Sequence, residues 1–244
     1  MKHLFANKKT KVLLWTLAGV FVVGVIVFIY AASSGKLAGQ ASTATTFSDV
    51  PTTYWAYNEI TASAMAGFAQ GYTDGTFRPT QPVTRDQAAV FIARAVAGGD
   101  VWVPNGPAVA HCSDVPTTQW AYKYVEYLIS QKVIGSDCGI AGTNATPKVY
   151  KPAQVLIRQE MAVLLARGMV GEANVSSGPT TPTFSDVATS NPAYKYIEYL
   201  AKLAIAQGYA GGTYRPGQSI TRDQIAVFIA RAFDLDDVLN GIID

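Results

Sequence analysis

The feature that most constrains this chain is a sequence pattern that occurs three times. Each copy opens with Ser-Asp-Val, and a string built around an arginine follows 36 positions after the aspartate in the first and third copies and 44 positions after it in the second. A repeat of this length is a supersecondary unit that cannot bury its apolar face alone, so we expect the copies to share one core. We name them block 1 (residues 47–97), block 2 (112–171) and block 3 (184–234); the paired residues are Asp49 and Arg85, Asp114 and Arg158, and Asp186 and Arg222.

The first half of each block is predicted to form a helix. It would start near Trp55 in block 1, near Trp120 in block 2 and at Asn191-Pro192 in block 3, where Asn191 would cap the helix and Pro192 would take its first position. Apolar residues then recur at helical spacing. Glycines are expected to end these helices, because glycine adopts the left-handed conformation of a helix C-terminus. They are Gly71, Gly135 and Gly208.

The second half of each block predicts another helix. Thr84 and Thr221 are candidate N-caps, and Gln87 and Gln224 follow three residues later, as a capping box requires. In block 2 the cap position is Ile157. The expected fold class is therefore all-α, with three helix-loop-helix units. Segments rich in Gly, Pro and small residues join the blocks.

The N-terminus carries a membrane signal. Residues 12–32 contain no charge, and at about 1.5 Å per residue a helix of this length crosses a hydrocarbon core of about 30 Å. Lysines concentrated in residues 1–11 predict a cytoplasmic N-terminus and an exported C-terminal region. The alternative is a cleaved signal peptide, whose apolar run is normally shorter. Residues 33–46 are predicted to be a linker and residues 235–244 a tail.

Composition excludes several classes of protein. Without the lysines of the first 11 residues, 15 basic residues face 17 acidic ones. This balance argues against a nucleic-acid partner, which would require a basic face. Two histidines and two cysteines do not support a metal centre, and we find no catalytic constellation and no motif for a cofactor.

Three strings in block 1 together resemble the S-layer homology (SLH) family. They are Phe47-Ser48-Asp49-Val50 followed by Trp55-Ala56, Gly71-Tyr72 through Pro79, and Val83-Thr84-Arg85-Asp86-Gln87. The resemblance covers residues 47–234 as three tandem repeats. It implies a pseudo-threefold arrangement of the repeats, with grooves between them that bind a secondary cell-wall polysaccharide or a peptidoglycan-linked glycan.

The motif arginines Arg85, Arg158 and Arg222 are the main candidate ligand contacts. A cation at a helix N-terminus is unfavourable by about 0.3–1 kcal/mol, so helix stability does not explain them. A bound anion does, because main-chain N–H groups and a guanidinium would converge on it. The alternative is an ion pair with the repeated aspartate of a neighbouring block. Block 1 keeps every element of the pattern, so the strongest effect is expected at Arg85 and the weakest at Arg158.

Other residues are assigned to the same grooves or to structure. Trp55 and Trp120 would either stack on sugar rings or seal the core of a hairpin. The glycan-binding set comprises these tryptophans, the three arginines, Asp49, Asp114, Asp186, Thr84, Thr221, Gly71 and Gly208. A second set of arginines lies nine residues after the first, on the opposite helix face, and is expected to form ion pairs. These are Arg94, Arg167 and Arg231.

The two cysteines both lie in block 2. Cys138 falls in an insertion of about eight residues and Cys112 just before Asp114. An even number of cysteines in an exported domain predicts one disulfide, with two free thiols as the alternative.

The leading functional hypothesis is a non-catalytic protein of the cell envelope, anchored in the membrane through residues 12–32, that binds an anionic wall glycan. The alternative is an assembly module that binds other surface proteins and no glycan.

Overall fold

A computed structural model describes residues 46–140 and 148–235, all of which lie within the compact unit Ser42–Asp244. The predicted membrane segment 12–32, the linker up to residue 45 and the tail from residue 236 fall outside the described residues. Within the part of the chain that is described, no helix combines the length and apolar character that a membrane crossing requires.

The described residues form three helix pairs and no β-strand, as the all-α prediction requires. The inner helices are α3 (Arg85–Ala97), α5 (Arg158–Val170) and α7 (Arg222–Ala232). The outer helices are α2 (Tyr57–Met65), α4 (Tyr122–Ser130) and α6 (Tyr194–Lys202). Two short 3₁₀ helices, η3 (Asp100–Trp102) and η4 (Glu172–Asn174), lie in the segments that join the blocks.

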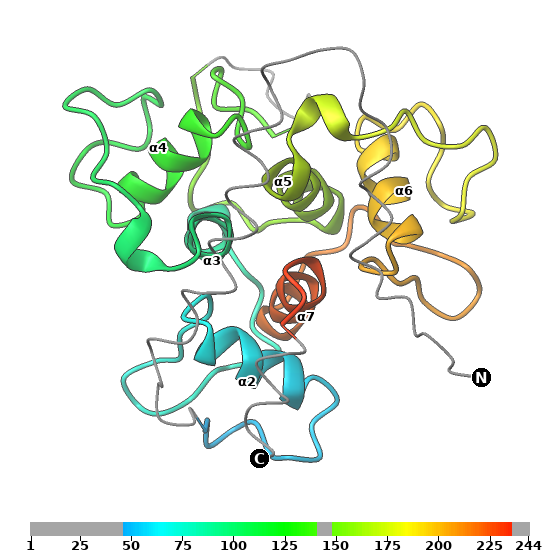
Figure 1. The fold of residues 1–244 in the computed structure, drawn as a ribbon, viewed down its shortest axis with the longest axis horizontal. Helices are drawn as coiled ribbons and strands as arrows, with labels where there is room; N and C mark the ends of the chain where they lie inside the picture. The colour runs from blue at the N-terminus through cyan, green and yellow to red at the C-terminus, as the bar shows by residue number, and fades with distance from the viewer. Residues whose placement is uncertain (1–45, 141–147, 236–244) are drawn as a thin grey trace, which may run out of the picture. The chain divides into compact units, whose positions relative to one another are not determined.

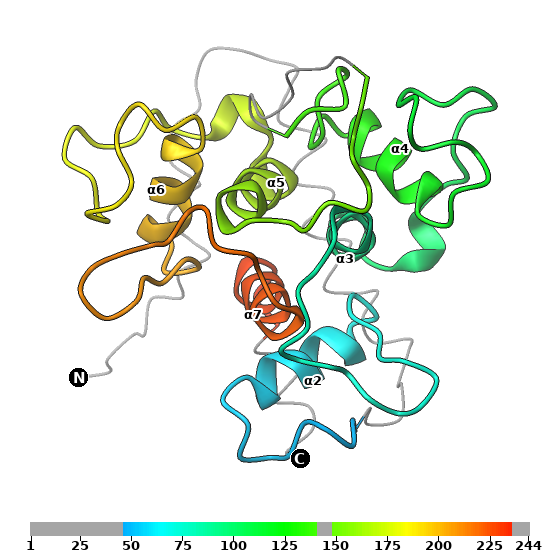
Figure 2. The ribbon, with the colours of Figure 1, turned by 180° about the vertical axis from the view of Figure 1, so that it is seen from behind.

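The inner helices pack against one another and each carries one outer helix (Figures 1 and 2). Each outer helix lies on the inner helix of the preceding block: α4 lies on α3 and α6 on α5. In the same way α2, from block 1, lies on α7, from block 3. This exchange ties the first block to the last.

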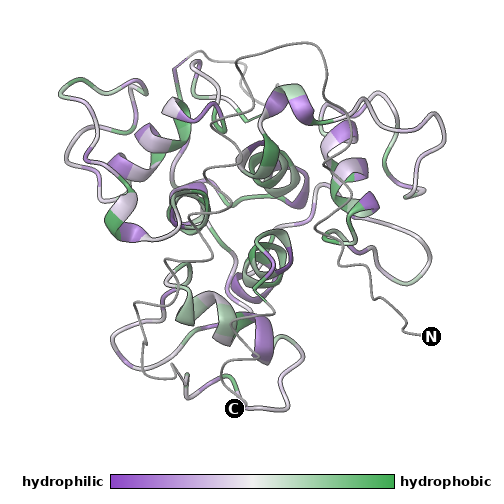
Figure 3. Cartoon of the chain, in the orientation of Figure 1, coloured by the Kyte–Doolittle hydropathy of each residue, from purple (hydrophilic) through white to green (hydrophobic). Residues whose placement is uncertain are grey.

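Most residues of the inner helices are buried, which suits a central position. Residues Met161 to Ala166 of α5 have no exposed surface, and Ala88, Ala89 and Ala93 of α3 are equally buried. Small alanine side chains let neighbouring helices approach closely. Helices α4 and α6 carry hydrophilic residues along their length, whereas α2 is hydrophilic mainly at one end, as Figure 3 shows by colour.

Short extended segments before the inner helices join the blocks in a closed cycle. The N–H of Val83 donates to Ile220 (3.0 Å), that of Leu156 to Val83 (2.8 Å) and that of Ile220 to Leu156 (3.0 Å). All three side chains are fully buried. The main chain therefore links block 1 to block 2, block 2 to block 3 and block 3 to block 1, and this cycle fixes where the inner helices start.

The predicted caps of the inner helices are partly confirmed. Thr84 and Thr221 are the N-cap residues of α3 and α7, in extended conformation. Gln87 accepts a hydrogen bond from the N–H of Thr84 (3.3 Å), as a capping box requires. Gln224 does not complete such a box: its amide nitrogen lies 3.4 Å from the hydroxyl of Tyr209 instead.

The predicted starts and ends of the outer helices need correction. These helices begin two residues later than expected, and Pro192 precedes α6 instead of occupying its first position. The three predicted glycines do not end helices, since α2 ends at Met65, α4 at Ser130 and α6 at Lys202.

Gly71 and Gly208 are instead required by close packing. A Cβ at Gly71 would lie 2.3 Å from the ring of Phe47, and one at Gly208 would lie 2.6 Å from the ring of Phe184.

Candidate functional site

The three motif arginines lie at the first position of the inner helices, as predicted, and all are buried. Each guanidinium reaches across to the following block and donates to a main-chain carbonyl there. The acceptors are Tyr150 (2.7 Å from Arg85 Nη1), Tyr214 (2.9 Å from Arg158 Nε) and Phe77 (2.6 Å from Arg222 Nε). The arginines therefore lie at junctions between blocks.

The repeated aspartates do not pair with these arginines. The carboxylate of Asp49 accepts the N–H groups of Phe77 and Arg78 at 2.7 Å each, within its own block. Arg78 has φ of 58°, a left-handed conformation that is strained for a residue with a side chain. Asp114 and Asp186 make the same two bonds in their blocks. The alternative interpretation, an ion pair between the motif arginines and these aspartates, is therefore wrong, and the aspartates hold a strained turn.

A groove of about 190 Å³ lies beside Arg222. Its guanidinium also donates to the carbonyl of Gln70 (2.7 Å) and packs on the ring of Tyr72, 4.9 Å from the centroid. Burial is the main cause that lowers the pKa of Arg222. Within the described residues it has no carboxylate at ion-pair distance. We call this site the Arg222 groove; it is lined by Gln70, Gly71, Tyr72, Gln87, Val90, Phe91, Arg94, Trp120 and Arg222.

A second groove, of about 170 Å³, lies beside Arg158 and repeats this design. Arg158 donates to the carbonyl of Gln207 (3.3 Å) and packs on Tyr209, again 4.9 Å from the ring centroid. Arg158 also has no carboxylate partner in the described part of the chain. We call it the Arg158 groove; it is lined by Trp55, Arg158, Ile205, Gln207, Gly208, Tyr209, Gln224, Val227, Phe228 and Arg231.

The tryptophans lie at the edges of these grooves, on the surface. Trp55 and Trp120 are each 59% exposed, so neither seals a hairpin core. Each indole N–H donates to an aspartate at the start of an inner helix, Asp223 for Trp55 (3.1 Å) and Asp86 for Trp120 (3.2 Å). These bonds fix the rings and leave their faces open. Ala56 and Ala121, next to them, are the buried residues.

Asp223 has a second donor beside Trp55. The hydroxyl of Tyr54 donates to its carboxylate at 2.8 Å. Burial and this bond together raise the pKa of Tyr54 to about 12. Two donors, the hydroxyl of Tyr54 and the indole N–H of Trp55, thus share one carboxylate, which holds the indole in place.

Arg85 differs from the other two motif arginines. Its guanidinium forms an ion pair with Glu160 of α5, and each side chain is only 2% exposed. The main-chain carbonyl of Arg85 in turn accepts the hydroxyl of Tyr150 (2.8 Å). Arg85 thus has a carboxylate partner supplied by the chain itself.

The second set of arginines forms ion pairs, as predicted. Arg94 contacts Asp100 (2.9 Å), Arg167 contacts Glu172 (2.6 Å) and Arg231 lies 3.9 Å from Glu59. Partial burial opposes ionisation of Asp100 and Glu172, but hydrogen bonds from basic and tyrosine side chains outweigh it and lower the pKa of each to about 2.

Two of these arginines also line grooves, which the sequence did not indicate. Arg94 lines the Arg222 groove and Arg231 lines the Arg158 groove. The helix-face argument separated Arg94 from Arg85 correctly, but the motif arginine beside Arg94 comes from another block. The sequence alone could not identify that neighbour.

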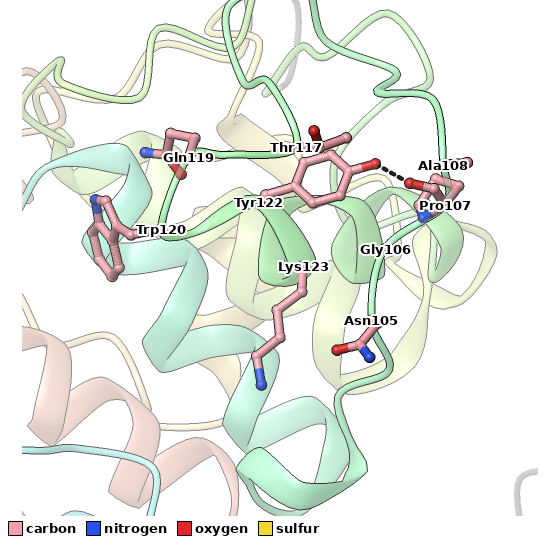
Figure 4. A pocket seen from close by; sticks show the side chains of 9 residues that line it. All are labelled: Asn105, Gly106, Pro107, Ala108, Thr117, Gln119, Trp120, Tyr122 and Lys123. Atoms are coloured by element: carbon pink, nitrogen blue, oxygen red, sulfur yellow. Dashed lines mark hydrogen bonds between the residues drawn. The ribbon is translucent and has the colours of Figure 1, made fainter.

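A broader depression of about 530 Å³ lies between the start of block 2 and the segment that joins it to block 1 (Figure 4). The hydroxyl of Tyr122 donates to the carbonyl of Pro107 on one side, and Trp120 stands at the opposite end. Lys123 is paired with Asp100 (3.2 Å). Trp120 therefore borders both this depression and the Arg222 groove.

The predicted disulfide is present. Cys112 and Cys138 are bonded, with a Cα–Cα distance of 5.8 Å, and both are fully buried. Neighbouring His111 contacts the buried carboxylate of Glu126. Within residues 46–140 and 148–235, no cluster of side chains could hold a metal ion.

Comparison with known proteins identifies part of the pattern. The S-layer homology domain model matches residues 46–89 and 183–226, which fall in blocks 1 and 3. The predicted resemblance is confirmed for these two segments, while block 2 as a third repeat stays a prediction.

Several curated proteins are similar over longer stretches. Cell surface glycoprotein 1 of Acetivibrio thermocellus is 29% identical over 71% of this chain, and the cellulosome-anchoring protein of the same organism is 25% identical over 73%. An endoglucanase of a Bacillus species is 34% identical over 50%. The alignments cover 7%, 38% and 12% of these relatives, respectively.

Proposed function

We propose that this chain is an anchoring protein of the cell envelope, which binds an anionic cell-wall polysaccharide in grooves between its blocks. The S-layer homology match and the similarity to a cell-surface glycoprotein and a cellulosome-anchoring protein support anchoring at the cell surface. The protein acts by binding, without catalysis. Residues 12–32 hold it in the membrane, with the C-terminal region outside the cytoplasm.

The observation that carries the proposal is the state of Arg158 and Arg222. Both guanidiniums are buried, and burial of a charge is costly unless an opposite charge pairs with it. Their described neighbours are carbonyl oxygens and aromatic rings, so the positive charge is not neutralised. A carboxylate or phosphate in the groove would neutralise it, and a guanidinium can bind such a group through two parallel hydrogen bonds.

The rest of each groove suits a sugar. The exposed faces of Trp55 and Trp120 offer flat apolar surfaces for the apolar side of a pyranose ring. Gln224 Oε1 is buried and accepts no hydrogen bond from the described residues. A ligand hydroxyl could donate to it.

The closed cycle of contacts supports the larger arrangement. Blocks 1, 2 and 3 repeat the same hydrogen bonds in the same order, and block 3 returns to block 1. We infer that the blocks are three SLH repeats about a pseudo-threefold axis, with block 2 included despite its insertion.

Co-sedimentation with cell walls tests the function. The full-length chain, kept in solution with a mild detergent, is mixed with sacculi from the cells that produce it. We expect Arg222→Gln to weaken binding about 10- to 100-fold, the loss of one charge-assisted contact. Lys132→Gln is the control, because it removes the same charge from an exposed residue that lines neither groove.

Two results would contradict the proposal. Equal binding by both variants would show that Arg222 does not contact the ligand. Absence of binding by the unmodified chain would favour the alternative, a module that assembles with other surface proteins.

A further inference from the structure

Each groove is built from all three blocks. The Arg222 groove takes its arginine from block 3, its tyrosine and glutamine from block 1 and its tryptophan from block 2. The Arg158 groove takes its arginine from block 2, its tyrosine and glutamine from block 3 and its tryptophan from block 1, so each contribution comes from the preceding block of the cycle. The third junction, at Arg85, therefore takes its remaining components from blocks 2 and 3.

We propose that the Arg85 junction is closed to ligand by the chain's own Glu160, so that the protein binds glycan in two grooves instead of three. This inference rests on the proposed function. It follows from four positions at which the Arg85 junction differs from both grooves.

The first position is the tyrosine that packs on the motif arginine. Tyr72 and Tyr209 follow Gly71 and Gly208, but Ser136 follows the corresponding Gly135. A second arginine, Arg215, also packs on Tyr209, 4.0 Å from the ring centroid. Arg78 does the same on Tyr72 at 3.8 Å. With Ser136 at this position, the aromatic platform is absent from the Arg85 junction.

The second position is the third residue of the inner helix. It is Gln87 in the Arg222 groove and Gln224 in the Arg158 groove, and both are neutral. Glu160 takes this place at the Arg85 junction and pairs with the guanidinium. An anionic ligand would have to displace a buried carboxylate and then leave it unpaired, which is strongly unfavourable.

The third and fourth positions concern the tryptophan and the acid that orients it. Pro192 stands where Trp55 and Trp120 stand in the other blocks, directly before the N-cap alanine. Gln159 replaces the acid, and its side-chain oxygen accepts a hydrogen bond from Asn191 (3.2 Å). The Arg85 junction thus has no sugar-stacking ring at this position.

These four changes lie in two different blocks and meet at one junction. Block 2 supplies Ser136, Gln159 and Glu160, and block 3 supplies Pro192. The departures of both blocks from the pattern therefore affect a single junction and leave the other two intact. Two grooves on one chain would still give multivalent attachment to a polymer, in which loss of either costs more than its own affinity.

Co-sedimentation of full-length variants with the same sacculi tests this inference. Trp55→Ala and Trp120→Ala each alter one groove at an exposed residue, so folding is preserved. We expect each to weaken binding about 10-fold or more, since one stacking contact and the bivalent attachment are both lost. We expect the double variant to show no specific binding. Pro192→Ala and the paired variant Arg85→Met/Glu160→Met should bind as the unmodified chain does.

The outcomes separate this inference from the proposed function. If the unmodified chain does not bind, the function itself is wrong. If it binds, and the Trp55→Ala/Trp120→Ala variant retains specific binding that Arg85→Met/Glu160→Met then removes, the Arg85 junction is a working site and the inference is overturned. A circular dichroism spectrum of each variant shows whether it is folded.

Discussion

Removal of Arg85 should destabilise the protein strongly, because it would leave Glu160 as a buried, unpaired carboxylate. Breaking a buried ion pair from one side costs about 3–5 kcal/mol. For a domain of 150–250 residues, each kcal/mol lowers the melting temperature by about 2–4 °C. We therefore expect Arg85→Ala to melt about 6–20 °C below the unmodified chain. Circular dichroism at 222 nm, recorded while the temperature rises, measures this difference.

The paired variant provides the control. Arg85→Met/Glu160→Met removes both charges, and replacing a buried pair with apolar residues of similar size is often neutral or stabilising. It does leave the carbonyl of Tyr150 without its donor, which lowers the free energy of unfolding by about 1–3 kcal/mol. The double variant should therefore melt above Arg85→Ala. A melting temperature of Arg85→Ala within about 2 °C of the unmodified chain would refute the reasoning.

Three further predictions concern stability. Replacement of Cys112 and Cys138 by serine should cost about 3–4 kcal/mol, the entropy of the closed loop, measured by urea unfolding with the intact chain under non-reducing conditions as reference; an unchanged midpoint would contradict it. The lowered pKa of Glu172 contributes stability that is present above pH about 4.5 and lost as the pH falls through about 2. Glu172→Gln should therefore flatten the pH dependence of the melting temperature in that range. A profile parallel to that of the unmodified chain would contradict this. Gly71→Ala should destabilise by about 1–3 kcal/mol in thermal unfolding, because its methyl group would collide with the ring of Phe47, and a neutral effect would show that the ring can move.

Local structure was largely predictable from the sequence. Inner-helix starts at Thr84 and Thr221, the Cys112–Cys138 bond and the ion pairs of the second arginine set all depend on neighbours close in the chain or on simple pairing rules. The outer-helix starts were placed two residues early because Trp55 and Trp120 were given a helical role. Their side chains instead lie on the surface and hydrogen-bond to an inner helix of another block.

The grooves were less predictable, because no block contains one. Each motif arginine was interpreted with the other residues of its own block, which favoured Arg85 as the main ligand contact. The structure places Arg85 beside Glu160 and leaves Arg158 and Arg222 without a carboxylate among the described residues. Aligning the blocks reveals Glu160 opposite Gln87 and Gln224, but only the order of packing shows which arginine it meets.

Binding stoichiometry tests the central claim most directly. An oligosaccharide repeat unit released from the sacculi can be titrated into the full-length chain in detergent and followed by isothermal calorimetry. Two grooves with an unpaired guanidinium predict two oligosaccharides per chain, and one per chain for Arg222→Gln. No binding would contradict glycan anchoring, and three per chain would contradict closure of the Arg85 junction by Glu160.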